Sequence, residues 1–187
     1  YLDRARCTDT TDLYADSAVN LYKNEPSAYG AYSIAKAYTK QEKYDKALEY
    51  FEEAIKQFTE EGEEENSDQI ARAYIGMAAA AIKMNQYAKT REYARKALKI
   101  NPNMGKAYLL IGSAYAASSK SCGGNEFEQR AVYWAAVDKF QKAKAVDPTI
   151  EKEANQLIRQ FTSLFPDNEL AFFHGKTNGD SYTVGCW

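Results

Sequence analysis

Apolar residues recur along most of this 187-residue chain at the spacing of amphipathic helices, and many of them are alanines or aromatic residues. Positions three and four residues apart lie on one face of a helix, so this spacing predicts helices that each bury one side. The pairs Asn101-Pro102 and Asp147-Pro148 close two of the apolar segments, because proline cannot continue a helix. The pattern predicts an all-α chain of short helices joined by turns.

The helical pattern repeats with the 34-residue period of a helix-turn-helix unit. The first copy starts at Ala28 and places its apolar residues at Ile34, Ala35, Tyr38, Tyr44, Ala47, Phe51 and Ala54. The second starts at Ala71 and places them at Tyr74, Met77, Ala78, Ala81, Tyr87, Ala94, Ala97 and Pro102. The third starts at Gly105 and places them at Tyr108, Ile111, Gly112, Tyr115, Tyr133, Ala136, Phe140, Ala143 and Pro148. Small residues let paired helices touch, and the large rings fill the gaps beside them.

These residues resemble the tetratricopeptide-repeat (TPR) family over 28–148. The resemblance implies an α-solenoid, a TPR superhelix of antiparallel helix pairs with repeats at 28–61, 71–104 and 105–149, the last with an insertion at 117–128. Neighbouring repeats of such a fold stack and form a concave face. The resemblance therefore also implies a scaffold for protein–protein interaction without enzymatic activity.

The segments on either side of the repeats have different patterns. Residues 1–27 predict the second helix of a preceding TPR, as expected of a piece from a longer array; an atypical capping helix is the alternative. Apolar residues at helical spacing predict a capping helix over 150–165, which would cover the last apolar face. Aromatic and β-branched residues around Asn178-Gly179 predict a short β-like tail over 166–187, with a candidate hairpin.

In the TPR family, five positions of each first helix line the inner face. Carried over to this chain, they are Tyr29, Tyr32, Lys36, Thr39, Lys40, Arg72, Ile75, Ala79, Ile82, Lys83, Lys106, Leu109, Ser113, Ala116 and Ala117. Five of them are basic and none is acidic, although the chain has 26 acidic and 24 basic residues.

The resemblance thus implies a partner-binding groove formed by Tyr29, Tyr32, Lys36, Lys40, Arg72, Ile75, Lys83, Lys106 and Leu109. Its charge favours a protein or peptide partner with acidic groups. In the alternative interpretation these residues are solvated or contact the chain's own tail.

One TPR subclass grips the terminal carboxylate of chaperones with Lys, Asn and Arg residues of this inner face. The corresponding positions here hold Tyr32, Lys36, Ala79, Leu109 and Ser113. Lys36 alone suits a carboxylate, and a bidentate grip needs several fixed donors. Capture of a chaperone tail is therefore not expected.

Composition and charge exclude several other functions. The net charge of −2 and the pI of about 5.6 give no basic excess for a nucleic acid. No apolar stretch reaches the roughly 18 residues of a membrane span, so direct membrane insertion is not expected. With three cysteines and one histidine, His174, the chain has no zinc motif, and no cofactor motif is found. A pair of His174 with a cysteine would lack a group to orient it, so we expect no enzyme.

The insertion and the tail also resemble uncharacterised TPR proteins from the cell envelope of Gram-negative bacteria. This resemblance implies a bacterial, exported scaffold in the periplasm or associated with the envelope. In an oxidising compartment Cys122 and Cys186 would be a candidate disulfide that joins the insertion to the tail. Free thiols are the alternative, because the sequence gives no distance between them.

The sequence is compatible with two functions. The first is a scaffold that binds a peptide or protein in the concave groove. The second is a structural, self-assembling unit that stacks on further copies or on the rest of a longer array. A monomer or a weak oligomer is expected.

Overall fold

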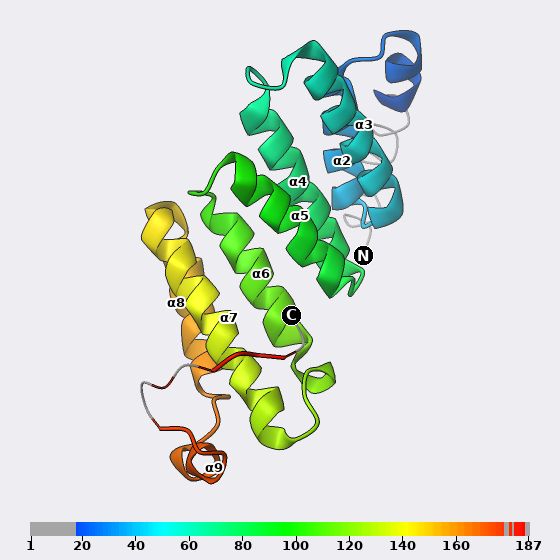
Figure 1. Cartoon of the computed structure of the whole chain (residues 1–187). Helices are drawn as coiled ribbons and strands as arrows, with labels where there is room; N and C mark the ends of the chain where they lie inside the picture. Colours follow the sequence, from blue (N-terminus) through cyan, green and yellow to red (C-terminus); the bar gives the residue numbers. More distant parts are fainter. Residues whose placement is uncertain (1–17, 178–179, 181, 186–187) are drawn as a thin grey trace, which may run out of the picture. The chain divides into compact units, whose positions relative to one another are not determined.

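The computed structural model describes residues 18–177, 180 and 182–185, and within these ranges the chain forms helices and turns and no strand (Figure 1). The predicted all-α class is thereby confirmed. Contacts divide the chain between Pro102 and Asn103 into two compact units, which we call the first and the second unit.

The first unit consists of two helix pairs: α2 (Ala28–Lys40), α3 (Tyr44–Gly62), α4 (Ser67–Lys83) and α5 (Tyr87–Ile100). Successive helices pack on each other, α2 on α3, α3 on α4 and α4 on α5. Both pairs use the same turn, with Glu42 and Asn85 in the left-handed conformation at φ 59° and 58°. After each of these residues, an N–H donates back to the first helix over 2.9 Å, from Lys43 to Tyr38 O and from Gln86 to Ala81 O. This helix-ending bond satisfies a carbonyl left free by the last turn, so the two copies end their first helix in the same way.

Small residues allow large rings to fill the centre of the first unit. Phe51 of α3 is 2% exposed and lies against Gly76 of α4, where even a β-carbon would collide with its ring. Ala47 and Ala54 flank Phe51 on α3 and are fully buried. The small residues therefore sit where helices meet, and the rings occupy the space that this leaves.

A further helical stretch, residues 18–24, precedes α2 and packs on α3. The hydroxyl of Tyr22 donates to Glu53 over 3.4 Å and accepts from Gln57 Nε2 over 2.6 Å. The rest of the predicted leading half-repeat, residues 1–17, lies outside the described residues.

The second unit contains α6 (Gly105–Ala117), α7 (Glu126–Val146), α8 (Glu151–Thr162) and α9 (Asn168–Phe173). Helix α7 packs on α6 and on α8. A β-carbon at Gly112 of α6 would lie 2.5 Å from Phe140 Cε1 and 2.8 Å from the carbonyl oxygen of Ala136, so only glycine allows this approach of α7. From α8, Phe161 stacks on Phe140 and on Tyr133, with ring centroids 5.7 Å apart in both pairs. Helix α8 thereby covers apolar rings of α7.

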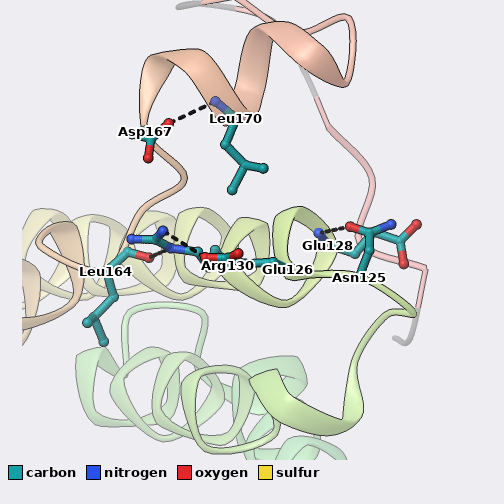
Figure 2. Close-up of polar contacts among 7 residues, drawn as sticks. All are labelled: Asn125, Glu126, Glu128, Arg130, Leu164, Asp167 and Leu170. Atoms are coloured by element: carbon teal, nitrogen blue, oxygen red, sulfur yellow. Dashed lines mark hydrogen bonds and ion pairs between the residues drawn. The ribbon is translucent and has the colours of Figure 1, made fainter.

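The predicted insertion lengthens α7. After α6, a 3₁₀ turn at Ser119–Ser121 leads to Cys122 and a loop, and α7 then begins at Glu126. The side chain of Asn125 accepts from Glu128 N–H over 2.9 Å and caps the helix (Figure 2). The added first turn carries Phe127, which is 2% exposed and anchors the C-terminal segment.

The predicted β-like tail is wrong for the described residues after Pro166. Directly after Pro166 the chain forms helix α9, and the described residues that follow form no strand. Asp167 caps this helix by accepting from Leu170 N–H over 2.8 Å (Figure 2), and Glu169 in the first turn favours the positive helix start. The candidate hairpin turn at Asn178-Gly179 lies outside the described residues.

The segment that follows α8 packs on α7 through aromatic contacts. Phe127 stacks on His174, with centroids 4.5 Å apart, and meets Tyr182 edge to face at 5.3 Å. Arg130 donates to Leu164 O over 3.3 Å and pairs with Glu126, so it ties the linker before α9 to α7 (Figure 2). The tail is therefore part of the second unit's packing.

Cys122 is buried and disulfide-bonded, and its partner lies outside the described residues. Residues 182–185 line a pocket together with Cys122, which places the tail beside it. We therefore keep the prediction that Cys122 pairs with Cys186. Peptide mapping without reductant should recover these two cysteines in one linked fragment, and a fragment that links Cys122 to Cys7 would contradict it.

Candidate functional site

The first helices of the first unit, α2 and α4, carry most of the predicted groove residues, and these two helices contact each other. We call their shared surface, defined by Tyr29, Tyr32, Lys36 and Arg72, the α2–α4 face. Tyr29 is 57% exposed, yet Gln69 of α4 donates to its hydroxyl over 2.9 Å. Its ring also meets the edge of buried Phe58 at 5.0 Å. Tyr29 is thus an exposed aromatic side chain held in one place.

Tyr32 lies one turn further along α2 and is half-buried. Phe51 supports its ring at 5.8 Å, and Lys36 Nζ lies 5.6 Å from the ring centroid. Burial raises the pKa of Tyr32, while the charge of Arg72 lowers it and that of Asp68 raises it. Charged groups of α4 are therefore close to this ring, and Lys36 lies beside it on α2.

Asp68 is a member of this surface that the groove prediction missed. Its carboxylate accepts from Arg72 Nε over 2.6 Å, and both side chains are more than half exposed. This hydrogen bond is the main reason why the pKa of Arg72 is raised. The spacing of four residues between an acid and a following base could have indicated the pair from sequence. Asp68 makes the α2–α4 face less positive than predicted.

Not every predicted groove residue is available to a partner. Ile75 of α4 is 8% exposed and packs inside the first unit. Lys40 and Lys83 are exposed, but each lies in the last turn of its helix, where a cation also offsets the negative helix end. The two lysines can therefore be explained by stabilisation of their helix ends as well as by a role in the predicted groove.

The two remaining predicted residues belong to the second unit. Lys106 and Leu109 are both on α6; Lys106 is exposed, whereas Leu109 is 4% exposed. The structure therefore groups the predicted residues of α2 and α4 within the first unit, and it describes Lys106 and Leu109 with the second unit.

Comparison with protein families decides the nature of the repeat. The family model described as "Tetratricopeptide repeat" matches residues 27–103, which include both helix pairs of the first unit. These residues belong to the TPR family. The predicted family is thereby confirmed.

Solved structures are similar to this chain in fold. The structure described as "First TPR of Spaghetti (RPAP3) bound to HSP90 peptide SRMEEVD" is similar with a TM-score of 0.57 and 18% identity, over 73% of this chain and 94% of the other. The "TPR2B-domain:pHsp70-complex of yeast Sti1" also has a TM-score of 0.57, with 22% identity over 73% and 96%. The structure of MamA has the same score and 13% identity over 87% and 92%. No curated protein sequence matches the chain.

The side chains considered for catalysis have other contacts in the described part of the chain. Cys122 is in a disulfide and so is not a thiolate nucleophile, and the ring of exposed His174 is stacked on Phe127. Within the described ranges, no three His, Cys, Asp or Glu side chains form a group that could hold a metal ion. Among the described helices, none has the length and apolar character needed to cross a membrane.

Proposed function

We propose that this chain is a non-catalytic interaction scaffold whose α2–α4 face binds a protein or peptide with acidic groups. The observation that carries the proposal is the pair of fixed, accessible rings, Tyr29 and Tyr32, with Lys36 and Arg72 beside them. Rigid aromatic side chains give contact area at little entropic cost, and the cations select for negative charge.

The exposed ion pair between Arg72 and Asp68 supports binding of a partner's carboxylate by Arg72. An exposed pair of this kind stabilises a protein by only about 0–1 kcal/mol, so breaking it costs little. A guanidinium can hold a carboxylate through two parallel hydrogen bonds. A partner's carboxylate can thus replace Asp68 on Arg72 while its apolar neighbours cover Tyr32.

The comparison with a peptide complex supports acidic partners but not the same mode of binding. The peptide in the RPAP3 structure has the sequence SRMEEVD, in which three of seven residues are acidic. This chain has Lys36 as its one suitable carboxylate-gripping residue, and Leu109 at another of those positions is buried. We therefore propose recognition of acidic side chains within a segment rather than of a terminal carboxylate.

Reversing the charge of the face should abolish this binding. Peptides selected from a random display library on the full chain should be enriched in Asp and Glu beside apolar residues. The double variant Lys36→Glu, Arg72→Glu should bind them at least about 100-fold more weakly, because each reversal replaces an attraction with a repulsion. Fluorescence anisotropy with a labelled peptide measures the affinity.

The matched control is Lys56→Glu, Lys89→Glu, which reverses two exposed lysines on the second helices α3 and α5. It should bind like the unmodified chain, and both variants should keep their helicity and melting temperature. Equal losses in both variants, or selected peptides without acidic residues, would argue against the face. Light scattering tests the self-assembling alternative, in which copies of the chain stack on one another. That alternative predicts concentration-dependent oligomers of the unmodified chain and of the double variant, and a strict monomer at high concentration would contradict it.

The single variant Lys106→Glu measures whether this residue of α6 contributes to binding of the same peptides. The periplasmic or envelope location stays a prediction from the resemblance.

A further inference from the structure

A cavity of about 510 Å³ lies in the second unit between α7, α9 and the tail. Its walls come from α7 through Trp134 and Asp138, from the linker before α9 through Phe165, and from the tail through Asp180 and Tyr182. The volume falls within the range of about 300–1,000 Å³ that is usual for small-ligand sites. The α2–α4 face is on other helices, so this cavity is a separate feature.

Three aromatic side chains line this cavity, with Trp134 between the other two. Its ring meets Phe165 at 6.3 Å and 80° and Tyr182 at 6.1 Å and 78°, so the neighbouring rings stand nearly perpendicular to it. The face of an aromatic ring is the negative part of its quadrupole and attracts cations. Lys176 Nζ, which does not line the cavity, lies 5.8 Å from the Tyr182 centroid, so this ring already has a cation near it.

The charged residues among the described lining are two carboxylates, Asp138 and Asp180, with no basic residue. Thr177 donates to Asp180 from its N–H over 2.7 Å and from Oγ1 over 3.0 Å. These hydrogen bonds, together with the weaker influence of Lys176, lower the pKa of Asp180. Asp180 therefore stays ionised at neutral pH and well below it, and the cavity has a negative charge at its aromatic walls.

We propose that this cavity binds an organic cation, an alkylated ammonium group placed at the Trp134 ring with Asp138 and Asp180 as its counter-ions. A metal ion fits less well, because it needs several oxygen ligands converging on one point and the described residues form no such group. An anion would meet two carboxylates and no basic residue among the described lining. The same ammonium chemistry is found in free small amines and in the lysine side chain of a partner protein.

Fluorescence titration of Trp134 tests the proposal directly. The chain has two tryptophans, so Trp187→Phe in the full chain leaves Trp134 as the single reporter. Choline should change its emission with saturation at millimolar concentrations, as expected of about 4 kcal/mol of binding. The neutral analogue 3,3-dimethylbutan-1-ol has the same shape without the charge and should bind at least about fivefold more weakly. A response of equal strength to both, or no saturation with any cation, would overturn the proposal.

Nα-acetyl-lysine amide, titrated in the same way, distinguishes a free small amine from the lysine side chain of a partner protein as the source of the ammonium group. Tighter binding than choline assigns the site to a protein side chain, and weaker binding assigns it to a free quaternary amine; both results support a cation site.

Removing the carboxylate charges should weaken choline binding without unfolding the chain. Asp138 is exposed on α7, so Asp138→Asn keeps the helix and should weaken binding about fivefold. The double variant Asp138→Asn, Asp180→Asn should lose saturable binding. Asp45→Asn, at an exposed position of α3 in the first unit, is the matched control and should bind like the parent. Unchanged affinity in the double variant would show that the carboxylates are not counter-ions.

Discussion

Replacing Gly112 with valine is expected to lower the free energy of unfolding of the second unit by about 3 kcal/mol or more. The new β-carbon would lie 2.5 Å from Phe140 Cε1 and 2.8 Å from the carbonyl oxygen of Ala136. A backbone oxygen in the middle of α7 cannot turn away without breaking the helix. Phe140 is fully buried, so its ring has no free space to enter. Helices α6 and α7 would have to separate.

Urea unfolding followed by tryptophan fluorescence measures this effect, because Trp134 lies on α7 of the second unit and residues 1–102 contain no tryptophan. Gly124→Ala is the control. Its β-carbon would be 3.8 Å from the nearest atom, Glu128 Oε2, which is ordinary contact. The control should stay within about 0.5 kcal/mol of the parent. Equal stability of the Gly112 variant would mean that α6 and α7 do not approach as closely as described.

Replacing Phe51 with alanine should destabilise the first unit by about 3–5 kcal/mol, the usual cost of removing a buried ring. Phe51 of α3 is 2% exposed, and its ring lies against Gly76 of α4. The ring also supports Tyr32 of the α2–α4 face at 5.8 Å. Its loss leaves a cavity and removes this support, so acidic peptides should also bind more weakly to variant protein that is still folded.

The first unit contains no tryptophan, so amide hydrogen exchange in α3 and α4 is the suitable measurement. Phe172→Ala is the matched control, because this phenylalanine is 71% exposed. The same chemical change should then cost less than about 0.5 kcal/mol. If both variants exchanged at the parent's rate, Phe51 would not be at the centre of the first unit.

The helix pairs could be predicted because the residues that pack against each other within a repeat are close together in the sequence. A glycine or alanine has to stand where helices touch, and an aromatic ring has to fill the adjacent space, so spacing alone indicates the arrangement. The first position of a repeat does not mark the start of its first helix: the second repeat is predicted at 71–104, and α4 begins at Ser67. The four preceding residues form an additional turn that carries Asp68 and Gln69, which contact Arg72 and Tyr29 of the α2–α4 face.

The tail and parts of the site could not be predicted for a different reason. The aromatic residues after Pro166 are typical of strands, but one capping side chain, Asp167, starts a helix there instead. Burial of Ile75 and Leu109 depends on the residues that other helices bring against them. A family position fixes where a side chain is on its helix, and the neighbours decide whether a partner can reach it.

The most direct test of the proposed scaffold maps a bound peptide on the chain. An acidic peptide from the library selection is added to the ¹⁵N-labelled chain, and amide chemical shifts are followed during the titration. The proposal predicts that the largest shifts lie on α2 and α4 around Tyr29, Tyr32, Lys36 and Arg72. Shifts confined to α3, α5 or the second unit would contradict it.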